Sequence, residues 1–172
     1  NGPQQRRFNG GLRGRKSSVF EGGIRSLGLM QWPGHTRAGT ALVERVAHID
    51  LFPTVLDIVG VPTKERKLDG ISLLPLLSGQ ARGHAERFLF FQCHRGLTPT
   101  KYQNAAILGE RWKLVMNEGQ FSNEDFQAGG TFGDIMLYDL EQDPGELINR
   151  SGVNSHVVSD LLKRYDQWFD DV

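Results

Sequence analysis

The residues best suited to chemistry lie in one glycine-rich segment, residues 10–25, which reads GGLRGRKSSVFEGGIR. Lys16 offers a compact positive charge with three hydrogen-bond donors, and the glycines allow backbone turns that other residues avoid. A P-loop is excluded, because that motif needs glycine directly before its lysine and Arg15 stands there instead. At the end of a sheet strand, such a loop can aim Lys16 into a cleft. The segment therefore predicts an oxyanion site that contains Lys16.

The elements that follow this loop resemble parts of a larger layered structure. The apolar run at residues 24–32 predicts a buried strand that ends at Pro33-Gly34. A helix is expected after Asp50, which would cap it, with Leu51, Phe52, Val55, Leu56 and Val59 as its apolar stripe and Gly60 as its end. A second short helix fits residues 72–77. We interpret residues 1–85 as the end of a larger α/β sheet.

After about residue 85 the pattern changes to strands. Strands are expected at 88–91, 105–108, 112–116 and 136–140, with a hairpin around Gly109-Glu110. An amphipathic helix that Asn154 or Ser155 could cap closes the chain, and its apolar face would carry Val157, Val158, Leu161, Leu162, Tyr165, Trp168 and Phe169. Residues 86–172 are therefore predicted to form a small α+β subdomain of about four antiparallel strands and one helix.

Composition narrows the function classes. The 172 residues carry no net charge and are 38% apolar, which is typical of a packed globular protein. No apolar run approaches the roughly 18 residues of a membrane span. The basic N-terminal part lacks interleaved aromatic residues, which disfavours a nucleic-acid partner. The single cysteine, Cys93, has no partner for an internal disulfide.

Several short motifs, in order along the chain, resemble the sulfatase family of the arylsulfatase type. These motifs are Asn1-Gly2-Pro3, LRGRK at 12–16, EGGIR at 21–25, Trp32-Pro33-Gly34, IDLFPT at 49–54, LDGISLLPLL at 68–77, LYDL at 137–140 and DPGE at 143–146. Each motif alone is modest, whereas their shared order over nearly the whole chain is specific. The chain resembles the C-terminal portion of such an enzyme.

The resemblance implies an alkaline phosphatase-like α/β fold and the hydrolysis of sulfate esters. Sulfatases use a formylglycine made from Cys or Ser, with a divalent cation, usually calcium, beneath it. By motif, Asn1 matches a metal-binding asparagine, and Lys16 matches the lysine that contacts the sulfate of the substrate. An asparagine carbonyl oxygen is an ordinary calcium ligand. A metal and a lysine together would neutralise charge on sulfuryl oxygens.

The sequence also departs from the family pattern. The formylglycine motif, Cys or Ser followed by x-Pro-x-Arg, does not occur here, and Cys93 does not fit it. Neither the aspartate that should precede Asn1 nor the family's early aspartate pair is in this sequence, and calcium needs roughly six to eight oxygen ligands. We therefore predict that this chain alone has no sulfatase activity and no tight metal site.

Other residues and functions stay open. His94 and Arg95 follow an apolar strand and could contact the organic group of the substrate, an aryl sulfate or a sulfated carbohydrate. Arg13, Arg15 and Arg25 are expected to be structural, and Glu21 is expected to brace the loop. The alternatives are a phosphatase or phosphodiesterase of the same superfamily and a non-catalytic module that binds sulfated ligands. By analogy the intact protein would be secreted, periplasmic or lysosomal.

Overall fold

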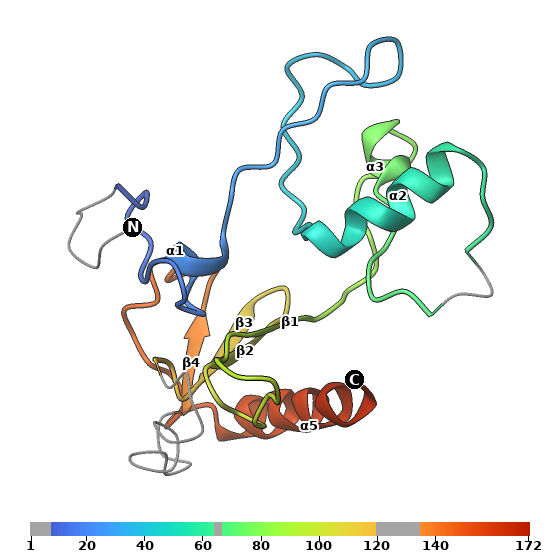
Figure 1. Ribbon diagram of the computed structural model, residues 1–172. Coiled ribbons are helices and arrows are strands. Elements are labelled where there is room, and N and C mark those ends of the chain that lie inside the picture. The colour runs from blue at the N-terminus through green and yellow to red at the C-terminus, as the bar shows by residue number, and fades with distance from the viewer. Residues whose placement is uncertain (1–7, 64–66, 120–134) are drawn as a thin grey trace. The chain divides into compact units, whose positions relative to one another are not determined.

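The computed structural model describes residues 8–63, 67–119 and 135–172. The chain divides into two compact units: one is Leu27–Glu86, and the other joins the segment ending at Ser26 to Arg87–Val172. The predicted domains placed all of residues 1–85 together. In this structure the segment before Leu27 instead belongs with the strands and the last helix, so the candidate loop at Lys16 lies in the same unit as the sheet (Figure 1).

The unit that contains the C-terminus is built on a four-stranded antiparallel sheet in the order β1-β2-β3-β4. The strands are β1 Leu89–Gln92, β2 Ala105–Leu108, β3 Trp112–Met116 and β4 Ile135–Asp139. The predicted bounds of β2 and β3 are confirmed, and those of β1 and β4 differ by one residue. The β2–β3 hairpin closes where the Gly109 N–H donates to the Trp112 carbonyl over 2.9 Å.

Helix α5, Ser155–Asp171, covers one face of this sheet, as the predicted amphipathic pattern requires (Figure 1). Leu161 and Tyr165 are buried in the same core as Ile107, Leu114 and Leu137. The rest of the predicted apolar face packs against that core: Val157, Val158, Leu162, Trp168 and Phe169. Asn154 is the N-cap residue, as predicted, but its side chain makes no capping hydrogen bond and its amide nitrogen donates to the Arg150 carbonyl.

The opposite face of the sheet is covered by the N-terminal segment. Strand alternation places Lys113 and its cross-strand neighbour Tyr138 on the face away from the α5 core. Phe20 packs on Tyr138 with ring centroids 6.0 Å apart. Val19 and Phe20 are almost fully buried, so the segment that carries Lys16 is part of the packed structure.

The predicted strand at residues 24–32 was wrong. Residues Glu21–Ile24 form a single helical turn, α1, and no strand follows among the described residues up to Trp32. The side chains of Leu27 and Leu29 are 91% and 93% exposed. An apolar run becomes a buried strand only when neighbouring strands pair with it, and residues 24–32 have no such neighbours among the described residues.

The unit Leu27–Glu86 contains the short turn η1 His48–Asp50 and the helices α2 Leu51–Ile58 and α3 Leu74–Leu77. Both helices were predicted, with α3 two residues shorter than expected. Asp50 precedes α2 but does not cap it; its carboxylate accepts the Ala47 and Ile71 N–H groups at 2.7 and 3.0 Å. Thr54 links the same segments, since its hydroxyl accepts the Leu73 N–H over 2.9 Å.

The apolar stripe predicted for α2 is largely exposed in this structure. Leu51, Phe52, Val55 and Val59 have between 53% and 63% of their surface exposed. Contiguous apolar surface of this kind is unusual on an isolated domain and normally marks a contact surface. This agrees with the interpretation of these helices as parts of a larger layered structure.

Candidate functional site

The candidate site is built on a tight loop, residues 13–18, that carries Lys16 at its turn. The loop folds onto α1: the Gly22 N–H donates to the Arg13 carbonyl over 2.6 Å, and the Ser18 N–H donates to the Arg15 carbonyl over 2.8 Å. Gly14 and Ser17 both have positive φ, at 88° and 74°. These two left-handed residues reverse the chain on either side of Arg15 and Lys16.

The two glycines of the Glu-Gly-Gly motif make this close packing possible. A β-carbon at Gly22 would lie 2.6 Å from the Arg13 carbonyl oxygen, and one at Gly23 would lie 2.1 Å from the Ser18 carbonyl oxygen. Both neighbours are backbone atoms, so a side chain at either position would push the loop away from α1. The motif is therefore the surface on which the Lys16 loop rests.

Lys16 itself is exposed at the turn. Within the part of the chain that the structure describes, its ammonium group makes no hydrogen bond or ion pair with another residue. The side chain is therefore available to an anion, while its backbone is held from both sides. A fixed backbone that carries a free cation is the arrangement expected of a residue that contacts an oxyanion.

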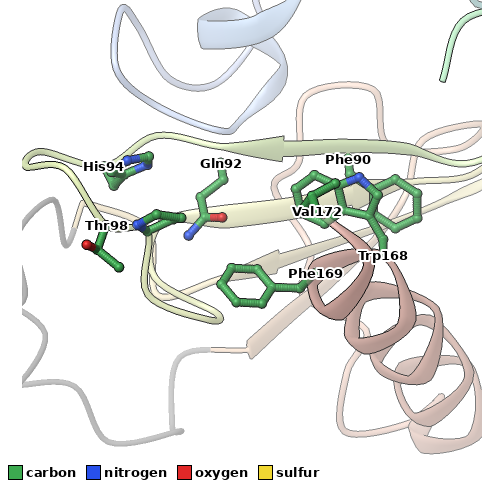
Figure 2. Close-up of a pocket in the computed structure, with 8 residues that line it drawn as sticks. Phe90, Gln92, His94, Thr98, Trp168, Phe169 and Val172 are labelled. Carbon is green, nitrogen blue, oxygen red and sulfur yellow. The ribbon is translucent and has the colours of Figure 1, made fainter. Parts of the chain in front are cut away.

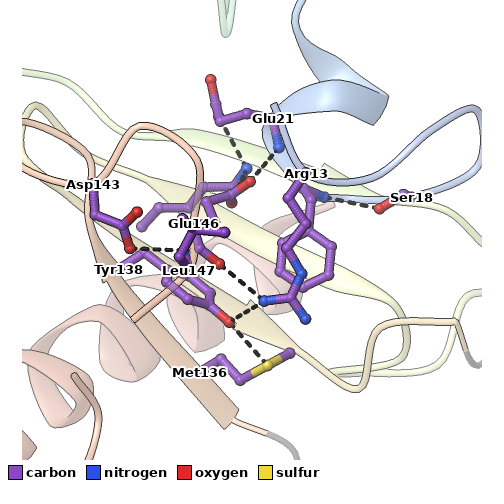
Figure 3. A network of polar contacts seen from close by, with 10 residues as sticks. Arg13, Ser18, Glu21, Met136, Tyr138, Asp143, Glu146 and Leu147 are labelled. Atoms are coloured by element: carbon purple, nitrogen blue, oxygen red, sulfur yellow. Dashed lines mark hydrogen bonds and ion pairs between the residues drawn. The ribbon is translucent and has the colours of Figure 1, made fainter. Parts of the chain in front are cut away.

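A buried ion cluster anchors α1 behind this loop (Figure 3). The ammonium of Lys113 lies 2.9 Å from a carboxylate oxygen of Glu21 and 2.9 Å from one of Glu146. The other Glu146 oxygen accepts the backbone N–H of Glu21 over 2.7 Å. Burial raises the pKa of Glu146, and the nearby Lys113 ammonium opposes that rise. Glu21 thus braces the loop, as predicted, but through a lysine of the sheet.

Arg13 fastens the start of the loop to the same network (Figure 3). Its guanidinium donates to the Tyr138 hydroxyl over 2.8 Å and to the Glu146 carbonyl over 3.0 Å. The guanidinium also lies over the Phe20 ring, 3.9 Å from its centroid, where a cation is favoured. The structural role predicted for Arg13 is confirmed.

His94 lies just beyond the end of β1, at a pocket that strand β1 and helix α5 line (Figure 2). Phe90, Gln92 and His94 line a cavity of about 540 Å³ together with Trp168 and Phe169 of α5. The indole of Trp168 stacks on Phe90 at 4.9 Å. The structure gives no direct contact between His94 and Lys16 within the described residues. Arg95 is exposed beside His94, and the roles of both in substrate binding stay predictions.

Metal ligands are not gathered in the described part of the chain. Residues 8–63, 67–119 and 135–172 contain no group of three or more His, Cys, Asp or Glu side chains that could hold an ion. Asn1, the predicted metal ligand, lies outside the described residues. Separately, none of the described helices has both the length and the apolar character to cross a membrane.

Sequence reasoning missed Lys113, Glu146 and Asn104 as parts of the site. One signal was available for Lys113: a lysine within the apolar strand Trp112–Met116 must find a carboxylate partner if it is buried. Glu146 was noted only as part of the DPGE motif. Asn104 precedes β2 in a segment without a readable motif, and its contacts are long-range.

Comparisons with known proteins identify the family of this chain. A family model described as "N-sulphoglucosamine sulphohydrolase, C-terminal" matches residues 15–169. The chain belongs to this family of sulfatase C-terminal domains. It is 35% identical to human arylsulfatase D over 81% of this chain and 26% of that protein, and 35% identical to human N-acetylgalactosamine-6-sulfatase over 94% of this chain and 27% of that protein. The family resemblance is confirmed.

Solved structures confirm the fold. The chain is similar to Ps i-CgsB, with a TM-score of 0.68 and 24% identity over 91% of this chain and 31% of that structure. It is also similar to a Bacteroides thetaiotaomicron protein, BT33336S-sulf, with a TM-score of 0.66 and 20% identity over 92% of this chain and 32% of that one. The fold is that of the alkaline phosphatase-like sulfatases. The chain spans about a third or less of the proteins it matches here.

Proposed function

We propose that this chain is the C-terminal part of a sulfuric ester hydrolase that, in its intact form, cleaves sulfate esters with a formylglycine nucleophile and a divalent cation. Membership of the sulfatase family supports the reaction class. The observation that carries the proposal is the Lys16 loop. Its backbone accepts a hydrogen bond from Gly22 of α1, while the Lys16 side chain stays exposed.

Lys16 is proposed to contact a sulfuryl oxygen of the substrate. Charge accumulates on these oxygens as the ester bond breaks, and a fixed cation stabilises that charge without having to reorganise first. Two sets of contacts fix the position of Lys16. The Gly22 N–H donates to the Arg13 carbonyl, and the ion pairs of Lys113 with Glu21 and Glu146 anchor α1 to the sheet. His94 and Arg95 are proposed to contact the organic group.

The nucleophile and the metal require residues other than those described. Asn1 is proposed as one calcium ligand, but a single amide oxygen cannot complete a site that needs roughly six to eight oxygen ligands. We therefore assign no catalytic step to the metal from these residues. The chain by itself is proposed to be inactive, because its sequence contains no Cys or Ser in the x-Pro-x-Arg context of formylglycine.

The substrate is proposed to be an aryl sulfate or a sulfated carbohydrate. The relatives bear names of both kinds, arylsulfatase D and N-acetylgalactosamine-6-sulfatase, at the same 35% identity. The proposal therefore stays at the level of a sulfate ester. The Lys16 loop would recognise the sulfate, which both substrate classes share.

The test is the hydrolysis of an aryl sulfate and a sulfated sugar by the complete protein that contains this chain, compared with the chain alone. The complete protein should turn over at least one sulfate ester, and Lys16→Ala should lower kcat by about 100-fold or more, the effect of losing one fixed donor to a developing charge. Lys163→Ala is the control, since Lys163 is an exposed lysine of α5. Turnover by the isolated chain, or an unchanged rate in Lys16→Ala, would overturn the proposal.

A further inference from the structure

Asn104 is a buried residue at the end of the sheet where three chain segments meet. It directly precedes β2, its side chain has no exposed surface, and its φ is +41°. Asparagine tolerates this left-handed backbone better than most residues with a β-carbon. Asn104 is a polar residue, and both the nitrogen and the oxygen of its side-chain amide make hydrogen bonds. These hydrogen bonds, rather than apolar packing, account for its burial.

Each polar atom of the Asn104 amide reaches a different part of the site. The amide nitrogen donates to the Ser17 carbonyl over 3.3 Å and to the Cys93 carbonyl over 2.8 Å, while the amide oxygen accepts the Gly119 N–H over 3.1 Å. Ser17 follows Lys16, and Cys93 precedes His94. Gly119 lies just after β3. One side chain thus links the Lys16 loop to the segments that leave β1 and β3.

We propose that Asn104 is a positioning residue that holds the Lys16 loop in register with the segment carrying His94 and Arg95. This inference rests on the proposed function of Lys16 in sulfate contact. The amide is chemically matched to the task, because it supplies two N–H donors for two carbonyls and one acceptor for an N–H. An aspartate of the same shape would place an oxygen against both carbonyls and would separate the segments.

Asn117 provides a matched control in the same region. It is also buried, at 1% exposure, it also has a left-handed backbone with φ of 44°, and its amide nitrogen donates to the Tyr102 carbonyl over 3.1 Å. No side-chain hydrogen bond links Asn117 to the Lys16 loop within the described residues. An Asn→Asp change places a carboxylate oxygen against a backbone carbonyl at both positions, but it cuts the tie to Ser17 only at Asn104.

The first experiment measures backbone hydrogen exchange in this chain for Asn104→Asp and Asn117→Asp. The Ser18 and Gly22 amides, which close the Lys16 loop, should exchange about tenfold faster in Asn104→Asp, the effect of one or two lost hydrogen bonds. They should keep their rates in Asn117→Asp. Asn104→Ala, which removes the ties without adding a charge, gives the same test if the aspartate variant does not fold. Equal acceleration in both Asp variants, or none at Asn104, would overturn the proposal.

The second experiment places the same changes in the complete protein and combines them with Lys16→Ala. If Asn104 acts through Lys16, Asn104→Asp should lower kcat/KM about tenfold when Lys16 is present and should cause little further loss when Lys16 is already alanine. If the double variant loses kcat/KM by the product of the two single losses, Asn104 does not act through Lys16. If the parent protein hydrolyses no sulfate ester, the proposed function fails, and the exchange experiment still decides whether Asn104 fixes the loop.

Discussion

Replacing Lys113 with methionine tests whether the buried ion cluster is what holds the Lys16 loop to the sheet. Lys113 is fully buried, and its ammonium lies 2.9 Å from both Glu21 and Glu146. Methionine has a similar length and fills most of the same space. Lys113→Met therefore removes the charge without opening a large cavity, and it leaves two buried carboxylates facing each other.

The expected loss of folding stability in Lys113→Met follows from the burial of the two carboxylates. Removing one partner of a buried ion pair typically costs about 3–5 kcal/mol, because the other charge stays buried and unpaired. Here two carboxylates lose the same partner, so we expect the upper part of that range. The whole stability of a domain is only about 5–15 kcal/mol. Lys113→Met should therefore remove a third or more of the free energy of unfolding of this unit.

The stability difference between Lys113→Met and the wild type should also depend on pH. Burial already raises the pKa of Glu146, and without the opposing Lys113 ammonium this pKa should rise further above its unfolded value. The folded variant then binds more protons than the unfolded chain, so its stability increases as pH falls through the raised pKa of Glu146. The difference from wild type should accordingly shrink in mildly acidic buffer. A difference that stays constant with pH would contradict the electrostatic explanation.

Urea unfolding followed by circular dichroism, together with hydrogen exchange at the β2 and β3 amides, would measure the loss in the unit that contains the cluster. Lys163→Met is the matched control, because Lys163 is exposed on α5 and the same change there should stay within about 0.5 kcal/mol. If Lys113→Met cost less than about 1 kcal/mol, or no more than the control, the cluster would not anchor the loop and our reasoning would be refuted.

The remaining predictions concern single contacts. Gly23→Ala should destabilise the Lys16 loop by about 1–3 kcal/mol in thermal unfolding, because its β-carbon would lie 2.1 Å from the Ser18 carbonyl oxygen, whereas Gly28→Ala, with open space around it, should be neutral. Burial and the hydrogen bond to Asp166 raise the pKa of Tyr102 to about 12, so its contribution to stability should fall as pH rises from about 10 through 12. Tyrosinate absorbance should show a lower pKa for Tyr102 in Asp166→Ala, and an unchanged titration would count against that bond. Asp50→Ala should cost about 2 kcal/mol, because the Ala47 and Ile71 N–H groups lose their acceptor, while Asp69→Ala at an exposed site should be nearly silent in the same assay.

The elements that sequence alone could predict are those whose signal is local. The hairpin of β2 and β3 has strands of apolar residues on both sides of Gly109-Glu110, and the α5 stripe repeats over a long helix. The strand expected at 24–32 failed for the opposite reason. Its apolar residues are compatible with a strand, but only pairing with neighbours would make it one, and the sequence of the run says nothing about its neighbours.

The cap expected at Asp50 failed because a carboxylate before a helix has several amides within reach. The sequence indicated the residue that would be bound to backbone N–H groups, but it did not indicate which ones. In the structure the carboxylate joins Ala47 to Ile71, so the IDLFPT and LDGIS motifs hold each other. A motif pair separated by about twenty residues thus proves to be one hydrogen-bonded unit, which could not be inferred from either motif alone.

The candidate site shows the same division between what is local and what is distant. The lysine, the arginines and the glycines of residues 10–25 led to the prediction of an oxyanion loop, and its role in binding stays a prediction. The residues that hold this loop lie far along the chain, since Arg13 bonds to Glu146 and Glu21 pairs with Lys113. A lysine in an apolar strand requires a carboxylate partner when it is buried, but it does not indicate which one. Lys16 lies in sequence between these two anchored residues, and among the described residues its own side chain stays exposed.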